Sequence, residues 1–321
     1  MAKTGSRLGA SLVIDVTYRC NARCAYCRWG DGRAAERQDI APNELCADPA
    51  LLRAAAVSRV VFSGGEPLLH AHLSDILTHY ASAGVSERVV ITNGLLATEP
   101  RIRAAHRAGA TGFAFSIDTL DAAAAMAARG MSAAQLDLAV EHLAAACRYA
   151  ALTGLEITVN CVLSAANCSV IGVRKLAARA AEVGAHFIKF QPVFDDGYLG
   201  MNAPALRLSA QHAPVARALA LDSQHWAIAS NSPAFFSDLA SLCEGDILEG
   251  TSCGLGERTY VLQRGGVVVC PWIRSLPVAT ANQVSIALQS FAAAKRTCGT
   301  GPHCFCLQPH EHRWRFRNAV G

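Results

Sequence analysis

Three cysteines lie within eight positions near the start of the chain, at Cys20, Cys24 and Cys27 in the stretch RCNARCAYCRWG. Thiolates bind zinc and iron–sulfur clusters, and structural zinc normally takes four protein ligands. A cubane of four irons held by three thiolates keeps one iron open to a small ligand. The spacing therefore favours an iron–sulfur cluster with an open position. Two alternatives remain, which are zinc with the more distant Cys46 as fourth ligand and a redox-active Cys-x-x-Cys pair.

The rest of the chain has the composition of a globular protein. Its 321 residues are 52% hydrophobic and 17% charged, which is enough for a large core. No apolar run approaches the roughly 18 residues of a membrane span, and the N-terminus lacks the features of a signal peptide, so we expect a cytoplasmic protein with no membrane partner. The cytosol does not maintain structural disulfides, so the 13 cysteines favour metal binding. The net charge of +4 is spread along the chain, which argues against a nucleic-acid partner.

The first 195 residues alternate between short β-rich runs and longer stretches rich in alanine and leucine. This alternation predicts a parallel sheet with right-handed crossovers, and six strands are too few for a closed eight-stranded barrel. We therefore expect an α/β fold, a partial (β/α)6 TIM-like barrel with its site at the carboxyl ends of the strands. The expected strands are 11–16, 59–64, 88–93, 112–117, 156–163 and 186–193, and the expected helices are 43–56, 71–83, 98–108, 132–151 and 168–182.

The pattern changes after residue 200. Residues 204–250 are typical of helices and loops, 258–270 predict a hairpin that turns at Gly265 and Gly266, and 282–296 predict one helix. We therefore expect two domains, residues 1–200 and a smaller domain over residues 201–321.

The cysteine spacing, the aromatic Tyr26 before the last cysteine and the stretch SGGEP at the end of the second expected strand resemble the radical S-adenosylmethionine (SAM) superfamily. The resemblance covers about residues 10–195. It implies that Cys20, Cys24 and Cys27 hold a [4Fe-4S] cluster that chelates SAM at its open iron. It also implies that an electron from the reduced cluster cleaves SAM to a deoxyadenosyl radical, which abstracts hydrogen from a substrate. Flavodoxin or ferredoxin would be the electron donor.

The same resemblance implies a set of residues that bind SAM at the strand ends. The GGEP segment would receive the methionyl amino group, and polar residues that end the next three strands would contact the ribose and the carboxylate. Each of those three also fits a strand-end cap, and Gln191 would face the adenine or the substrate. The expected cofactor-binding residues are Tyr26, Gly64, Gly65, Glu66, Pro67, Asn93, Ser116, Asn160 and Gln191.

The cysteines of the tail resemble the auxiliary-cluster regions called SPASM and Twitch. Too few cysteines remain for the two clusters of a full SPASM domain, so we expect one Twitch-like [4Fe-4S] cluster, with a structural zinc as the alternative. The expected ligands are Cys253, Cys270, Cys304 and Cys306, with Cys298 competing for a place. Cys243 lies outside this set. It is a candidate catalytic thiol that would donate a hydrogen atom in an epimerase, and a buried structural cysteine is its alternative.

The sequence gives less information on the class of substrate than on the fold or the cofactor. We expect a small polar metabolite of the sugar or aminocyclitol type, oxidised or epimerised in natural-product biosynthesis. The cyclase of molybdenum cofactor synthesis is disfavoured because the chain ends in AVG and lacks the Gly-Gly tail of that family. The alternative is a peptide-modifying (RiPP) maturase that uses a separate recognition protein, since the cysteine motif starts at residue 20 and leaves no room for a preceding recognition domain. A zinc-binding RNA-interaction module remains possible only without iron.

Overall fold

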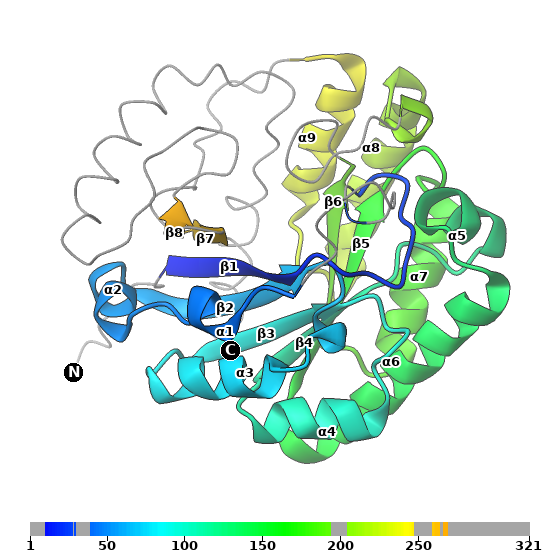
Figure 1. The fold of residues 1–321 in the computed structure, drawn as a ribbon. Helices are drawn as coiled ribbons and strands as arrows, with labels where there is room; N and C mark the ends of the chain where they lie inside the picture. Colours follow the sequence, from blue (N-terminus) through cyan, green and yellow to red (C-terminus); the bar gives the residue numbers. More distant parts are fainter. Residues whose placement is uncertain are drawn as a thin grey trace, which may run out of the picture.

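The computed structural model describes residues 10–27, 29, 39–193, 204–246, 259–263 and 266–268. Six parallel strands form its centre (Figure 1), and each pairs with the next along the chain. They are β1 (Ala10–Thr17), β2 (Val57–Gly64), β3 (Glu87–Thr92), β4 (Gly112–Ser116), β5 (Glu156–Leu163) and β6 (Phe187–Pro192). The sheet is curved but does not close, which confirms the expected partial barrel.

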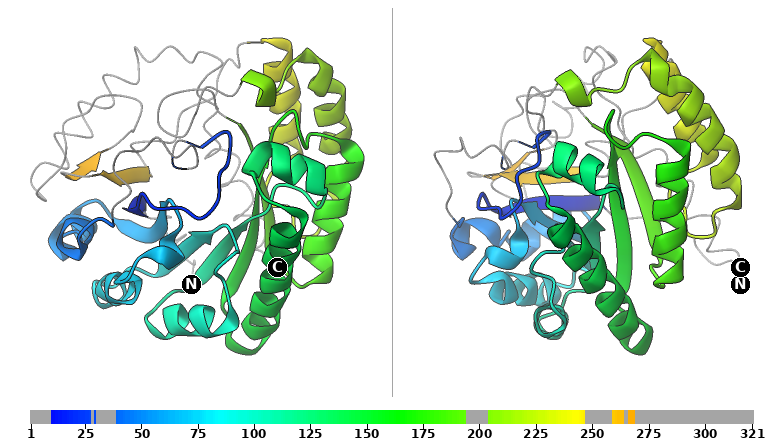
Figure 2. Two further views of the ribbon diagram at one scale, coloured as in Figure 1. Left: turned by 45° about the vertical axis from the view of Figure 1, so that its right-hand side comes forward. Right: turned by 90° about the vertical axis from the view of Figure 1, so that its right-hand side faces the viewer.

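Helices follow the strands and cover one face of the sheet (Figures 1 and 2). They are α1 (Pro42–Leu45), α2 (Pro49–Ala54), α3 (Leu73–Ser82), α4 (Glu99–Arg107), α5 (Ala122–Arg129), α6 (Ala133–Thr153) and α7 (Val170–Glu182). The single helix expected at 43–56 is two helices. Pro49 starts the second one with Asp48 as its N-cap, and the residue before a proline is disfavoured in helical geometry. Helix α5 was not expected from the sequence.

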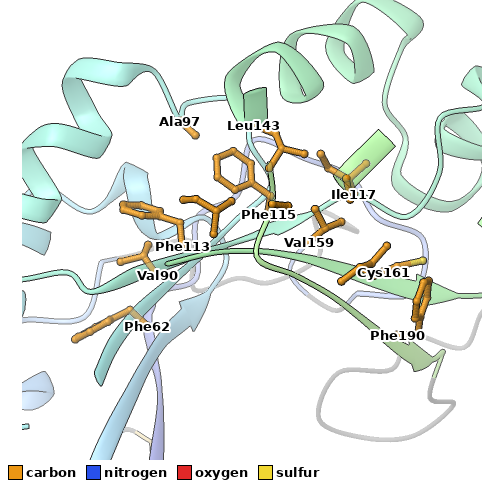
Figure 3. Close-up of a cluster of buried hydrophobic side chains, with 14 of the residues drawn as sticks. Phe62, Val90, Ala97, Phe113, Phe115, Ile117, Leu143, Val159, Cys161 and Phe190 are labelled. Atoms are coloured by element: carbon orange, nitrogen blue, oxygen red, sulfur yellow. The ribbon is translucent and has the colours of Figure 1, made fainter. Parts of the chain in front are cut away.

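The core lies between the sheet and these helices. Burial alternates strictly along β5, where Val159 and Cys161 are buried and Asn160 between them is only partly buried. Figure 3 shows Phe115 of β4 and Leu143 of α6 pointing toward one another on the helix side of the sheet. Successive side chains of a strand point to opposite faces. The polar residue Asn160 therefore lies on the face away from the helices.

The segment after β6 packs beside the barrel. Residues 204–246 contain α8 (Ala213–Asp222) and α9 (Pro233–Glu244), which pack on one another. Between them the Asn231 side chain accepts a bond from the Phe190 N–H (2.6 Å) and donates one to the Phe190 carbonyl (3.0 Å). The amide thus pairs with the outer edge of β6 as a neighbouring strand would. No helix in the described ranges is long and apolar enough to cross a membrane.

The hairpin expected in the tail is present as β7 (Thr259–Gln263) and β8 (Gly266–Val268), which pair antiparallel. Gly266 belongs to β8 and not to the turn in which it was expected. Strand β7 pairs in parallel with β1, and the complete sheet order is β6-β5-β4-β3-β2-β1-β7-β8. The expected helix at 282–296 and the expected auxiliary ligands Cys253, Cys270, Cys298, Cys304 and Cys306 lie outside the described residues.

Candidate functional site

The cysteine loop, residues 18–27, leaves the carboxyl end of β1 and runs toward α5 (Figure 2). Asp39, which follows the loop in the sequence, lies beside Thr17 at the end of β1. The Thr17 hydroxyl donates to Asp39 Oδ1 at 2.7 Å, Thr17 and Asp39 form a bridge, and Arg19 lies 3.4 Å from the same carboxylate. These contacts fix the base of the segment that carries the three cysteines.

The GGEP segment is packed directly against the cysteine loop. The Gly65 N–H donates to the Thr17 carbonyl at 2.7 Å, and the Glu66 N–H donates to the Arg19 carbonyl at 2.8 Å. A Cβ at Gly65 would lie 2.0 Å from the Arg19 carbonyl oxygen, and Gly64 has φ +112° with the Thr17 carbonyl 2.4 Å from its Cβ position. Gly64 therefore makes room for the backbone at the end of β1, and Gly65 makes room for the backbone of the loop. Their contact with an amino group of SAM stays a prediction.

The Glu66 side chain points into the protein. Its carboxylate is fully buried and accepts bonds from the Leu68 N–H (3.1 Å), the Thr92 hydroxyl (2.9 Å) and the Asn93 N–H (2.7 Å). Burial raises the pKa of Glu66 to about 7, while these hydrogen bonds oppose the rise. Glu66 thus joins the ends of β2 and β3. Pro67 begins the short helix η1 (Pro67–Leu69), which Glu66 caps.

Asn93 links β3 to the cysteine loop. Its Nδ2 donates to Asn21 Oδ1 at 2.7 Å and lies 3.9 Å from Cys20 Sγ, while its Oδ1 accepts the Leu95 N–H at 3.0 Å. The last bond is the strand-end cap that was the alternative role for this residue. A direct contact between Asn93 and SAM stays a prediction.

Ser116 and Asn160 are brought together by the strand register. They are Cα partners on β4 and β5, and both lie on the face away from the helices. Gln191 is on β6, where its Cα partner is Val162 of β5. A hydroxyl and an amide therefore lie side by side on the face of the sheet away from the helices. Their contacts with SAM remain predictions.

Tyr26 is held by two residues that the sequence analysis missed. Its hydroxyl donates to Asp118 Oδ2 at 2.5 Å and accepts a bond from Arg129 Nη1 at 3.1 Å. Arg129 and Asp118 form an ion pair at 3.3 Å, and both side chains are buried. Asp118 follows β4 in the stretch FSID, which was a visible signal for a site residue. Arg129 ends the helix α5 that was not expected.

The electrostatics of the thiols suit a positively charged group between them. Burial raises the pKa of Cys20 to about 11, and burial also raises the pKa of Cys24. The Ala22 N–H favours the thiolate of Cys20, and the charge of Arg129 favours the thiolate of Cys24. Buried thiols of this kind ionise when a cation binds them. The residues therefore fit an iron–sulfur cluster.

Zinc is the alternative metal for the same residues. In the described part of the chain, no three His, Cys, Asp or Glu side chains converge on a point where one metal ion would bind. The choice between zinc and an iron–sulfur cluster stays a prediction. Cys46, the distant fourth ligand in the zinc alternative, caps α1 and is free.

Cys243 lies near the end of α9 with only 8% of its surface exposed, as part of the hydrophobic core. Burial raises the pKa of this thiol to about 11. A hydrogen-atom donor has to reach the substrate. The burial of Cys243 favours its structural alternative, and its catalytic role stays a prediction.

Residues 14–163 match the family model of the Radical SAM superfamily. The GTP 3′,8-cyclase of Chlorobaculum tepidum is 36% identical over 109 residues, which are 34% of this chain and 32% of that protein. The PqqA peptide cyclase of Xanthomonas euvesicatoria pv. vesicatoria is 30% identical over 204 residues, 63% of this chain and 52% of that protein. The matches thus span about a third to a half of these curated relatives.

Two solved structures share the fold. Streptococcus suis SuiB bound to S-adenosylmethionine has a TM-score of 0.65 and 12% identity, with 92% of this chain and 72% of that chain covered. The structure of anSMEcpe with bound AdoMet has a TM-score of 0.62 and 16% identity, with 92% and 88% covered. At this identity the likeness concerns the fold alone.

Proposed function

We propose that this radical SAM enzyme, whose radical SAM domain spans residues 14–163, cleaves SAM reductively and abstracts hydrogen from a peptide. One observation carries the choice of a peptide. The similarity to PqqA peptide cyclase extends over 204 residues, whereas the similarity to the GTP 3′,8-cyclase of Chlorobaculum tepidum extends over 109. The expected sugar or aminocyclitol substrate gains no support from these relatives. A separate recognition protein for the peptide remains part of the proposal.

In this proposal Cys20, Cys24 and Cys27 hold the first cluster, which when bound supplies the electron for SAM cleavage. The contacts of Gly65 and Glu66 with the cysteine loop fix the loop at the strand ends. Ser116 and Asn160 would bind polar groups of SAM, because they lie side by side on the face of the sheet away from the helices. Cys253, Cys270, Cys304 and Cys306, or Cys298 in place of one of them, would hold an auxiliary [4Fe-4S] cluster, and flavodoxin or ferredoxin would donate electrons.

Iron analysis tests the cluster assignment. Anaerobically reconstituted protein should hold about eight irons per chain, two cubanes of four. Replacing Cys20, Cys24 and Cys27 together by Ala should leave about four and abolish formation of 5′-deoxyadenosine from SAM. The control is Cys147→Ala, which removes a buried thiol of α6 and should keep both the iron and SAM cleavage. SAM cleavage that survives in the triple variant would refute the assignment.

The substrate class needs a second experiment. Deuterated synthetic peptides, made from short reading frames that neighbour the gene, are incubated with SAM and reductant, and GTP is used in a parallel reaction. We expect deuterium in 5′-deoxyadenosine and a change of mass in one peptide. A product that has lost two hydrogen isotopes would indicate oxidation or cross-linking, and a product in which one deuterium is replaced by hydrogen from the solvent would indicate epimerisation. Turnover of GTP with every peptide unchanged would overturn the peptide proposal.

A further inference from the structure

Arg129 is a buried cation with one unused donor. Only 5% of the surface of Arg129 is exposed, and its Nη1 donates to the Tyr26 hydroxyl and to Asp118 Oδ2. Its Nε is buried and has no hydrogen-bond partner among the described residues. A buried guanidinium N–H without an acceptor is costly, so such a group calls for an explanation.

The backbone of Arg129 places this cation at the cysteine loop. The Arg129 carbonyl accepts the Arg23 N–H at 3.3 Å, and the Ala128 carbonyl accepts the Ala25 N–H at 2.9 Å. Cys24 lies between these two bonded residues. The end of α5 is therefore paired with the stretch of loop that carries the second cysteine, and the side chain of Arg129 reaches Tyr26 farther along the same loop.

Two buried charges of opposite sign lie beside this stretch of the loop. The guanidinium of Arg129 and the carboxylate of Asp118 form an ion pair at 3.3 Å, and both contact the hydroxyl of Tyr26, two residues after Cys24. The cation and its counterion therefore act on the sulfur of Cys24 with opposite signs.

We propose that Arg129 is a positioning residue for the first cluster, that its guanidinium compensates the charge of the Cys24 thiolate, and that the Arg129–Asp118 pair sets the cluster's reduction potential. The proposal rests on the cluster assigned above to Cys20, Cys24 and Cys27. Potentials of iron–sulfur clusters depend on net charge and on hydrogen bonds to the sulfurs. Reduction adds an electron, so a nearby cation favours the reduced cluster and a nearby carboxylate disfavours it.

The test is a redox titration of the SAM-free, anaerobically reconstituted full chain, followed by electron paramagnetic resonance. The first cluster is identified as the signal that the Cys20, Cys24 and Cys27 triple Ala variant lacks. Arg129→Met should lower the ratio of reduced to oxidised cluster at least tenfold at a fixed potential, which is about 59 mV for one electron. Asp118→Asn should raise the ratio, and Arg129→Lys, which keeps the charge, should change it less than Arg129→Met.

If Arg129 and Asp118 act through their charges, Arg129→Met and Asp118→Asn should shift the reduction potential in opposite directions. A loosened structure would shift the potential of both variants in the same direction. The double variant Asp118→Asn/Arg129→Met restores neutrality and should return near the wild-type potential. If Arg129→Met does not fold, the rise in potential expected for Asp118→Asn and its reversal in the double variant test the proposal. The matched control is Arg174→Met, which breaks the exposed pair with Asp222 between α7 and α8 and should leave the potential unchanged. Retained iron with an unchanged potential in both Arg129→Met and Asp118→Asn, or shifts of one sign in these two variants, would overturn the proposal. Wild-type protein without the signal would instead refute the proposed function.

Discussion

At Gly65 the space of a missing side chain is taken by the backbone of the cysteine loop. The nearest atoms to an added Cβ belong to Arg19 and Tyr18, and the nearest is 2.0 Å away. The glycine of SGGEP could be recognised from the sequence as a site of close backbone approach. The identity of the approaching group could not, because it depends on the fold bringing the end of β2 against the loop.

Gly65→Ala should therefore lower stability by about 1–3 kcal/mol or more, since the loop backbone has to move. It should also lower the iron bound per chain after reconstitution. The measurements are thermal unfolding and iron analysis. The control is Gly112→Ala at the start of β4, where a Cβ would lie 3.0 Å from the Glu156 carbonyl. That variant should lose stability but keep its iron, and full iron in Gly65→Ala would contradict the expectation.

Among the elements, the strands were predictable and one helix was not. Each of the six barrel strands lies within two residues of its expected bounds, because buried β-rich runs such as VVF and VVI between turn signals are typical of parallel strands. Helix α5 has the sequence AAAAMAAR, which shows no apolar periodicity. Its N-cap Asp121 and the Gly130 that follows it were the available signals. The role of Arg129 depends on where α5 ends in space, which local sequence does not specify.

Gly130→Ala tests the contact between the end of α5 and the cysteine loop. Gly130 has φ +61°, and its Cβ would lie 3.0 Å from the Arg23 carbonyl. Gly154 also ends a helix, with φ +74°, but has open space around its Cβ position. Both variants should lose about 1–2 kcal/mol from left-handed backbone strain. Only Gly130→Ala should bind less iron and be cleaved faster by trypsin after Arg23, and equal behaviour of the two variants would show that the contact is unimportant.

For the whole molecule, the hairpin of β7 and β8 makes the tail part of the same sheet as the barrel. Residues Ser11–Ile14 of β1 pair with Thr259–Leu262 of β7. The sequence predicted the hairpin, but its pairing with β1 joins residues about 250 positions apart and has no local signal. The edge of β1 is thereby covered by a strand, as the edge of β6 is covered by Asn231.

Val261→Pro should disrupt this arrangement. Val261 pairs with Val13 on one side and Val268 on the other. A proline inside a central strand removes a ladder hydrogen bond, and the acceptor left without a partner costs about 1–3 kcal/mol. The control is Val267→Pro. Gln263 and Gly266 flank the turn as a hydrogen-bonded pair, so the next pair, Leu262 and Val267, is a non-hydrogen-bonded one. Thermal unfolding should show a large loss only for Val261→Pro, and equal losses would indicate that β7 does not stabilise the barrel.

The bridge between Thr17 and Asp39 has a consequence for engineering. Because Thr17 and Asp39 form a bridge, we expect the segment between these two positions to be exchangeable as a cassette. A cassette of different length from a relative closes on the same two residues, and each doubling of loop length costs only about 0.6 kcal/mol in chain entropy. Transplanted segments would have to keep the three cysteines and the backbone contacts of the loop with the GGEP segment and with the end of α5.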